Sequence, residues 1–254
     1  MTRFVRFAVG TTVSYGVVEG DCVRQITGSP FAAWQPTDVT HKLVEVKLLV
    51  PTEPSKVLAL AGNYRSHLGS KPVPEHPELF LKTPSCLIAD GESIVLPADT
   101  RPVEAEAELV IVIGKRARHV PVATAQDYVL GITCGCDVSA REWQRGDIQW
   151  ARAKATDTFG PCGPFLVTGV PADDLRLQLR VNGQVQQDQR TADLIHGVAE
   201  IVSWASRYMT LEPGDLIYTG TPGTTPALQP GDTVEVELER VGILTNRVVA
   251  EGSR

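Results

Sequence analysis

Glycine and proline interrupt this chain at short intervals, and only brief apolar runs lie between them. The 22 glycines and 18 prolines make up about 16% of the residues, whereas about 12% is usual. Both residue types favour turns and disfavour the interior of a helix. We therefore expect a mainly β protein with a few helices (α+β), in which short strands are joined by tight turns.

Apolar runs near the start predict a small unit of their own. Short strands begin at Phe4 and are separated by turns at Gly10 and Gly20. Prolines and polar residues then interrupt the pattern before the next apolar run. We predict a small N-terminal β domain over residues 1–55 and a main domain over residues 56–254.

Periodicity in the remainder predicts further strands and two helices. Residues 194–209 carry apolar side chains three and four positions apart, with Thr191 as the N-cap. His196 falls on the polar face of this helix, so we expect it at the surface. The predicted strands are 109–113, 175–181, 216–218 and 234–238, and a shorter helix is expected over 123–130.

Charge and hydropathy exclude several classes of protein. The 30 acidic and 24 basic residues form no long run of one sign, so we expect no nucleic-acid partner. No apolar stretch reaches the roughly 18 residues of a membrane helix, and the first residues are too weakly apolar for a secretion signal. We therefore expect a cytoplasmic protein with no membrane partner. The five cysteines lack the spacing of a zinc site, and we expect Cys134 and Cys136 to be small buried hydrophobes.

Three glutamates alternate with small apolar residues directly before a predicted buried strand. A period of two places Glu104, Glu106 and Glu108 on one face, with successive positions about 7 Å apart. Like charges so close to a core are costly unless a cation compensates them, and oxygen ligands favour magnesium, manganese or calcium. A solvated strand end whose acids face water is the alternative. The spacing alone does not decide between the two.

A second polar cluster follows another apolar strand. Asp137 ends this run and could supply a third oxygen ligand. Arg141 and Gln144, four and seven residues later, would share one face of a helical turn. Their side chains could then donate hydrogen bonds to an anionic substrate.

Taken in order, these motifs resemble the fumarylacetoacetate hydrolase superfamily over nearly all of residues 56–250. Residues 1–50 resemble the small β domain that precedes the catalytic domain in many bacterial members. The matching segments are GNYRSH (62–67), LFLKTPS (79–85), EAEL (106–109), DVSAR (137–141), KATDTFGPCGP (154–164), VNG (181–183) and PGDLIYTGTP (213–222).

The resemblance implies a mixed β-sheet roll that works as a homodimer with one magnesium or manganese ion per subunit. By the same resemblance, Glu106, Glu108 and Asp137 are the metal ligands, and Glu104 is a solvated or outlying acid. We expect removal of Glu106 or Asp137 to abolish metal binding without unfolding the chain, because we place both residues at strand ends rather than in the core.

The resemblance also implies roles for residues around the metal. Lys154 matches a lysine near the ion, where an ammonium group would stabilise a developing oxyanion, so its loss should lower turnover and spare metal binding. Arg141 and Gln144 match substrate contacts, and Thr221 matches a residue that helps to hold a substrate carboxylate. A surface position for Lys154, an ion pair for Arg141 and a plain turn at Thr221 are the alternatives.

His67 matches a histidine on the mobile lid of family members, which commonly works with a glutamate three residues later. Ser70 stands at that position, so Glu75 or Glu78 would have to serve as the acidic partner. We expect residues 62–80 to form the lid and to be mobile without a ligand.

The implied activity is a divalent-metal-dependent reaction on a 2-oxo acid or acylpyruvate-type substrate from aromatic or related catabolism. Hydrolysis of a carbon-carbon bond, decarboxylation and isomerisation are all reachable once such an acid chelates the cation. His67 should matter most for hydrolysis, and the other two reactions should depend mainly on the metal and Lys154. The alternatives are a lyase acting on ureidoglycolate and a non-catalytic, metal-stabilised protein that binds a small acid.

Overall fold

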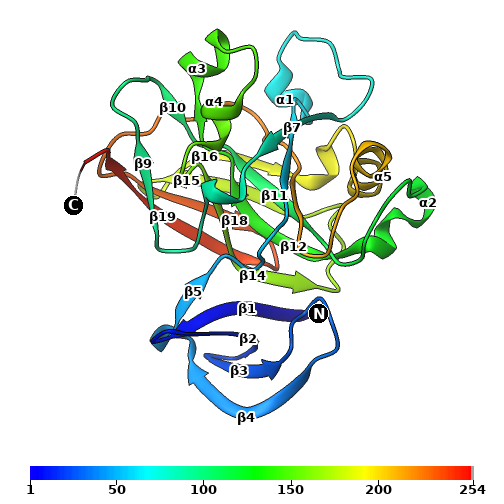
Figure 1. Ribbon diagram of the computed structural model, residues 1–254. Helices are drawn as coiled ribbons and strands as arrows, with labels where there is room; N and C mark the ends of the chain where they lie inside the picture. Colours follow the sequence, from blue (N-terminus) through cyan, green and yellow to red (C-terminus); the bar gives the residue numbers. More distant parts are fainter. Residues whose placement is uncertain (253–254) are drawn as a thin grey trace.

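A large mixed sheet runs through the whole molecule in the computed structural model, which describes residues 1–252 (Figure 1). Its main path is β4-β3-β2-β1-β14-β12-β11-β17-β6-β7, with β5 paired to β1 and β8 to β14. The strands of this sheet are β1 (Thr2–Val9), β2 (Thr12–Glu19), β3 (Cys22–Thr27), β4 (Gln35–Lys42), β5 (Lys47–Leu49), β6 (Val57–Ala61), β7 (Glu78–Lys82), β8 (Leu87–Ile88), β11 (Ala107–Ile113), β12 (Val129–Cys136), β14 (Gly160–Thr168) and β17 (Leu216–Tyr218).

A second sheet packs against the middle of the first and has the order β16-β15-β18-β19-β9. A short pair, β10 with β13, lies beside the two sheets. The strands are β9 (Ser93–Leu96), β10 (Val103–Glu104), β13 (Ser139–Ala140), β15 (Arg176–Val181), β16 (Gln184–Arg190), β18 (Thr233–Leu238) and β19 (Gly242–Ala250).

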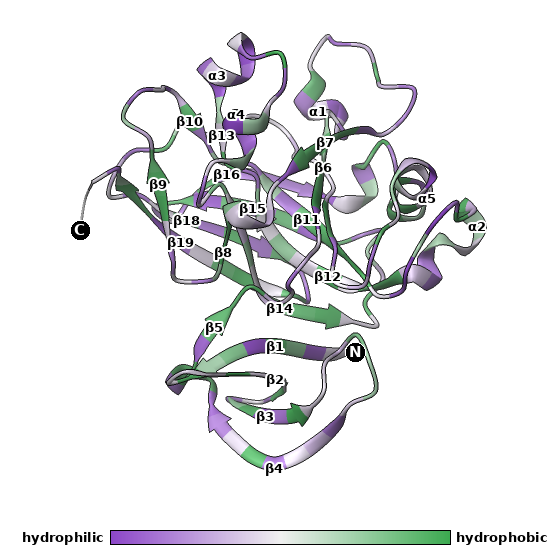
Figure 2. Cartoon of the chain, in the orientation of Figure 1, coloured by the Kyte–Doolittle hydropathy of each residue, from purple (hydrophilic) through white to green (hydrophobic). Residues whose placement is uncertain are grey.

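Strand β11 is buried on both faces, which explains its unbroken apolar sequence. Leu109 and Ile111 belong to the cluster that also contains residues of β15 and β18. Val110 and Val112 point the other way, into a second cluster that includes Phe4 of β1. The hydropathy colouring shows this band of apolar strands through the centre of the molecule (Figure 2).

The N-terminal strands form an antiparallel meander that continues the main sheet (Figure 1). Strand β1 pairs antiparallel with β14, with Thr2 opposite Thr168 and Phe4 opposite Leu166. Backbone hydrogen bonds therefore join this unit to the rest of the chain. The division into two domains at residue 55 stays a prediction.

Helices are few and short, which confirms the mainly β fold class. The α-helices are α1 (Arg65–Leu68), α2 (Val122–Ala125), α3 (Arg141–Gly146), α4 (Ala151–Ala155) and α5 (Val198–Tyr208), and the 3-10 segments are η1 (Leu43–Glu45), η2 (Pro84–Cys86), η3 (Gln126–Tyr128) and η4 (Thr191–Asp193). Within residues 1–252, no helix has the length and apolar character needed to cross a membrane.

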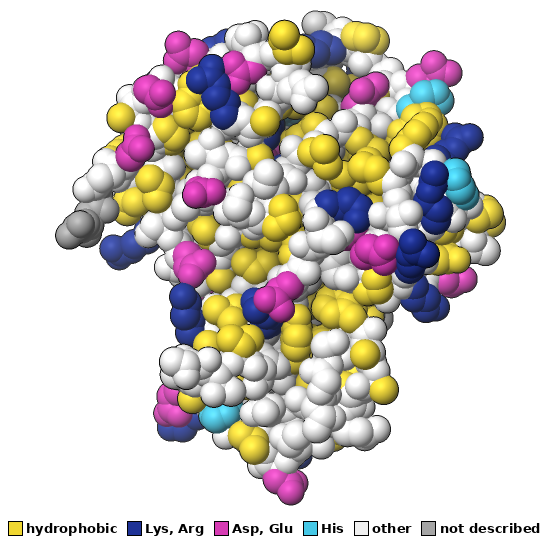
Figure 3. All heavy atoms as spheres, viewed as in Figure 1, with side chains coloured by type: hydrophobic (Ala, Val, Ile, Leu, Met, Phe, Trp, Pro, Cys, Tyr) yellow, Lys and Arg dark blue, Asp and Glu magenta, His cyan; other side chains and the backbone are white. Residues whose placement is uncertain are grey.

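Most of the predicted elements agree with the structure. The four predicted strands correspond to β11, β15, β17 and β18, and α2 with η3 covers most of the shorter predicted helix. The two neighbouring cysteines of β12 are buried, as expected, and all five cysteines are free thiols. In the face drawn in Figure 3, acidic and basic side chains are both present on the main body and on the N-terminal unit.

The start of the long helix was predicted wrongly. Helix α5 begins at Val198 after Gly197, and Thr191 lies in η4 instead of capping it. The Thr191 hydroxyl donates to Ala172 O at 2.7 Å and accepts from Leu175 N–H at 2.8 Å, so it bonds to the loop that precedes β15. These longer-range hydrogen bonds outweigh the local capping preference.

The surface position predicted for His196 is also wrong, because its side chain is buried. Its Nδ1 lies 2.9 Å from Glu200 Oε1 and its Nε2 lies 3.1 Å from Pro74 O. The helix starts too late to include His196, so helical periodicity does not describe its environment. His196 instead connects α5 to the segment that follows α1.

We predict that Gly131→Ala in β12 destabilises the protein, because an added Cβ would lie 2.3 Å from the backbone oxygen of Val167 in β14. Overpacking of this kind costs about 2 kcal/mol. Gly146→Ala is the matched control, since its Cβ would meet nothing within 4 Å. Urea unfolding measures both variants, and equal stabilities would contradict the prediction.

Candidate functional site

Three carboxylates converge where the β11–β12 ladder ends. Ala107 pairs with Cys136 in the antiparallel register. Glu106 precedes Ala107 and Asp137 follows Cys136, so these two residues lie opposite one another. The backbone N–H of Asp137 donates to the carbonyl of Glu106 at 2.9 Å. One carboxylate oxygen from each of Glu106, Glu108 and Asp137 lies within 4.8 Å of the other two. Register therefore brings together acids that are distant in the sequence.

These acids do not face water. Glu106 is 4% exposed, and Glu108 and Asp137 are 0% exposed. The alternative of a solvated strand end is therefore wrong for this group. A buried carboxylate needs a counter-charge or hydrogen bonds to remain ionised, so the surrounding cations decide what the cluster can do.

Two buried lysines compensate part of this negative charge. The Lys154 ammonium donates to Glu106 Oε2 at 2.8 Å and to Asp137 Oδ2 at 2.6 Å, so the alternative of a surface lysine is wrong. Burial alone would raise the pKa of Glu106, but the charges of Lys154 and Arg141 hold it far below its usual value. Burial opposes the charge of Lys154 as well, yet Asp137 and Glu106 raise its pKa, so Lys154 stays an ammonium ion.

Lys82 is a site residue that the sequence analysis did not assign. Its ammonium, at the end of β7, donates to Asp137 Oδ1 at 2.7 Å and to the backbone oxygen of Phe159 at 3.1 Å. The side chain is fully buried. The sequence feature that could have identified Lys82 is its place in the LFLKTPS segment, because a lysine at the end of a buried apolar run needs an acidic partner.

Glu108 is the one ligand candidate that the lysines do not reach. Its Oε2 accepts the Gly220 N–H at 2.6 Å, and its Oε1 is buried without a hydrogen-bond partner among residues 1–252. Burial, then the charges of Asp137 and Glu106, raise the pKa of Glu108 well above its usual value. An orphaned oxygen beside two further carboxylates fits a hard divalent cation, which these three residues would hold through oxygen alone.

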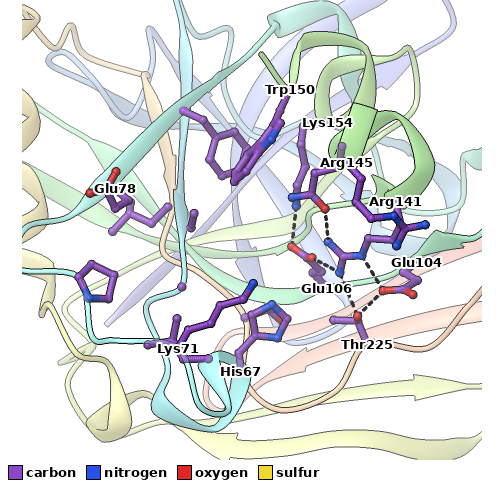
Figure 4. A pocket seen from close by; sticks show the side chains of 18 residues that line it. His67, Lys71, Glu78, Glu104, Glu106, Arg141, Arg145, Trp150, Lys154 and Thr225 are labelled. Atoms are coloured by element: carbon purple, nitrogen blue, oxygen red, sulfur yellow. Dashed lines mark hydrogen bonds and ion pairs between the residues drawn. The ribbon is translucent and has the colours of Figure 1, made fainter. Parts of the chain in front are cut away.

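Arg141 connects the cluster to the outer acid Glu104. Its Nε donates to Glu104 Oε2 at 2.6 Å and its Nη2 donates to Glu106 Oε1 at 2.5 Å (Figure 4). The same guanidinium contacts Gln144 Oε1 at 2.8 Å and Thr225 Oγ1 at 2.9 Å. Arg141 and Gln144 share one face of α3, as predicted, and the ion-pair alternative for Arg141 is present in the structure. Both residues also line the pocket, so a substrate contact stays a prediction.

Thr221 is held by the backbone of β11. Its hydroxyl donates to Ala107 O at 2.9 Å and accepts from Gln187 Nε2 at 3.0 Å. The residue is buried at the wall of the pocket. These bonds position the loop after β17 against the carboxylate cluster, and the role of Thr221 toward a substrate carboxylate stays a prediction.

A pocket of about 630 Å³ opens over Glu106 and Lys154. Helix α1 and the segment after it form one wall, and β7, α3 and α4 contribute the others. Figure 4 shows His67 and Lys71 on the wall opposite Trp150, with Glu106 and Arg141 to one side. The predicted lid residues therefore border the cavity above the carboxylates, and their mobility stays a prediction.

The lid histidine is oriented by the backbone. Nδ1 of His67 lies 2.7 Å from the carbonyl oxygen of Gly223. A carbonyl only accepts, so Nδ1 carries the proton and Nε2 of the neutral ring keeps its lone pair. Neither Glu75 nor Glu78 is a hydrogen-bond partner of His67 within residues 1–252. Ser66 fixes the same loop, since its hydroxyl accepts the Gly223 N–H at 3.0 Å.

Burial of the ligands revises two expectations. Asp137→Ala would leave the ammonium groups of Lys82 and Lys154 without their carboxylate, and breaking a buried ion pair costs about 3–5 kcal/mol. We therefore expect Asp137→Ala to lower stability, and the prediction that its removal leaves the fold intact stays a prediction. Lys154 bonds to two of the predicted ligands, so we now expect Lys154→Ala to alter metal affinity as well as turnover.

Two family models match this chain in succession. The family described as fumarylacetoacetate (FAA) hydrolase C-terminal matches residues 56–249. The family described as Rv2993c-like, N-terminal, matches residues 2–51.

Similar proteins include several enzymes. The crystal structure of a 2-hydroxyhepta-2,4-diene-1,7-dioate isomerase from Mycobacterium marinum is 42% identical, with a TM-score of 0.94 and 100% of both chains covered. The mitochondrial oxaloacetate tautomerase FAHD2A of Bos taurus is 39% identical over 81% of this chain and 70% of its own length. A maleylpyruvate hydrolase from Sphingobium sp. SYK-6, in complex with manganese(II) ion and pyruvate, is 31% identical with a TM-score of 0.82, over 98% of this chain and 99% of that one.

We predict that Glu108→Gln removes metal binding without destabilising the metal-free protein. The substitution deletes a buried charge that has no cationic partner, and the new amide can donate to the carboxylates of Glu106 and Asp137. Thermal unfolding in EDTA should give a melting temperature no lower than wild type. Magnesium at a hundredfold excess over Kd should stabilise the wild type by about 2.7 kcal/mol and leave the variant unchanged.

Glu45→Gln, an exposed acid of the N-terminal unit, is the control and should keep the full magnesium response. A Glu108→Gln variant that kept this response, or that melted several degrees lower in EDTA, would show that the assignment of Glu108 is wrong.

Proposed function

Since the chain belongs to the fumarylacetoacetate hydrolase family, we propose that it is a divalent-metal-dependent enzyme that isomerises 2-oxo acids by proton transfer beside the keto group. The observation that carries this proposal is the orientation of the His67 ring, which borders the same pocket as Glu106, is bonded through Nδ1 to Gly223 O and has no carboxylate partner within residues 1–252. The isomerase and the tautomerase among the similar proteins support the same type of reaction.

Magnesium or manganese is the proposed metal, held by Glu106, Glu108 and Asp137. A bound ion would be chelated by the carboxylate and keto oxygens of a 2-oxo acid and would make the neighbouring C–H more acidic. Support comes from the oxygen-only donors of this chain and from the manganese(II) ion in the similar maleylpyruvate hydrolase.

His67 is the proposed base, which replaces the expectation that isomerisation depends mainly on the metal and Lys154. With Nδ1 donating to Gly223 O, the lone pair of Nε2 is available to take a proton from the carbon beside the keto group. Lys154 is not proposed for this role, because its ammonium group already donates to Glu106 and Asp137. Its positive charge instead stabilises the oxygen that gains negative charge as the enolate forms.

Proton transfer fits this site better than hydrolysis. Both reactions would convert the neutral His67 ring to an imidazolium ion, which the usual lid glutamate would stabilise and which Ser70 cannot. In isomerisation the ring then only has to return this proton to another atom of the same substrate, whereas hydrolysis also requires attack by the activated water and cleavage of a carbon-carbon bond. Three other reactions should be tested beside isomerisation: hydrolysis, decarboxylation and lyase action on ureidoglycolate. The alternative without turnover is a non-catalytic protein that binds a small acid. Homodimerisation, a cytoplasmic location and a role in aromatic catabolism stay predictions.

We predict that His67→Gln lowers the rate of isomerisation by about 10²-fold or more, the usual contribution of a general base. The measurement is exchange of the C3 protons of oxaloacetate into D₂O, followed by NMR together with the ultraviolet absorbance of the enol. Wild-type exchange should require magnesium and cease in EDTA.

His41→Gln, in the N-terminal unit, is the matched control and should exchange at the wild-type rate. A panel of acylpyruvates and ureidoglycolate is measured in parallel. Unchanged exchange in His67→Gln would remove the histidine from the mechanism, and absence of metal-dependent turnover of every substrate would leave the non-catalytic alternative.

A further inference from the structure

Lys71 extends from the lid into the same pocket, one residue after the serine that replaces the usual lid glutamate. Its backbone is held in place by α1. The Lys71 N–H donates to Leu68 O at 3.1 Å, and Arg65 Nη1 donates to Lys71 O at 3.0 Å. Gly69, with φ of 59°, provides the left-handed turn that brings these groups together.

The charge of Lys71 is uncompensated. Its ammonium group forms no ion pair within residues 1–252, which also holds for Arg145 of α3 in the same pocket, whereas Arg141 and Lys154 are already paired with acids of the pocket. Figure 4 shows the Lys71 side chain reaching past His67 toward the middle of the cavity. A solvated cation at the rim of a concave site attracts anionic groups of a ligand.

The acids of the pocket do not cancel this charge. Glu104 and Glu106 are neutralised by Arg141 and Lys154. Glu78, at the start of β7, is drawn apart from Lys71 in Figure 4, and the two form no ion pair within residues 1–252. The rim of the pocket near the lid is therefore locally positive, and the cluster beneath it is where a 2-oxo acid would be chelated.

We propose that Lys71 binds a second, distal carboxylate of the substrate and selects 2-oxo dicarboxylic acids over the matching monocarboxylic acids. This inference rests on the proposed function, which places the 2-oxo end of the substrate at the carboxylate cluster. The two charged ends of such a substrate meet two different parts of one cavity of about 630 Å³. Chemistry occurs at the carboxylate cluster, and Lys71 acts on specificity alone. A charge-assisted contact of this kind corresponds to about tenfold in affinity.

The test is calorimetric titration of the magnesium-loaded protein with three matched pairs of acids. These are oxaloacetate with 2-oxobutyrate, 2-oxoglutarate with 2-oxopentanoate, and 2-oxoadipate with 2-oxohexanoate. The members of each pair differ only in the distal carboxylate. Wild-type protein should bind at least one dicarboxylate about tenfold more tightly than its partner.

Lys71→Met should abolish this preference by weakening the dicarboxylate about tenfold, with the monocarboxylate unchanged. Lys71→Arg should retain the preference, and Lys115→Met, an exposed lysine remote from the pocket, should behave as wild type. Equal weakening of both members in Lys71→Met would indicate a structural role for the lid residue and overturn the proposal. So would a preference that Lys71→Met leaves intact, or a wild type without any preference.

Turnover separates this inference from the proposed function. If Lys71 controls the preference in binding but no acid undergoes metal-dependent proton exchange, the specificity proposal stands and the isomerase proposal fails. If exchange occurs and the preference does not depend on Lys71, the isomerase proposal stands and the assignment of Lys71 is wrong.

Discussion

Three carboxylates buried at the end of one β-ladder are the constraint on which the rest of the site depends. Glu106, Glu108 and Asp137 are brought together by the register of β11 and β12, in a buried place where only Glu106 borders the pocket. Burial of uncompensated like charges is prohibitive. Lys82 of β7 and Lys154 of α4 form ion pairs with Asp137 and Glu106. Glu108 is the carboxylate of the three that still lacks a cationic partner within residues 1–252.

This distribution of charge connects stability with function. Asp137 is shared by both lysines, so it holds β7 and α4 against the end of β12. Glu108 has a backbone donor and one unsatisfied oxygen, which costs stability until a cation is present. A site of this kind is assembled by folding before any ligand arrives. The pairing of Arg141 with Glu104 and Glu106 extends the network to the rim of the pocket.

Contacts with other parts of the main domain fix the position of the lid. Gly223 orients His67 from the loop after β17, and the carbonyl of Pro74 is bonded to His196 beside α5. His76 stacks on Trp204 of the same helix, with ring centroids 4.3 Å apart. The segment that borders the pocket is therefore held at both ends by elements of the main domain, and its position follows from theirs.

The sequence by itself determined the fold class, most strands and the identity of the acids. Gly and Pro spacing and apolar alternation are local properties, and they describe β11, β15, β17 and β18 correctly because each strand is short and buried. Spacing alone left the acids undecided between a metal site and a solvated strand end, and resemblance to known motifs supplied Asp137 and Lys154 as their partners. Only the tertiary structure decided the burial of His196, the later start of α5, the place of Lys82 and the backbone partner of His67. Each of these depends on groups far apart in the chain, whose proximity is set by strand pairing and packing rather than by neighbouring residues.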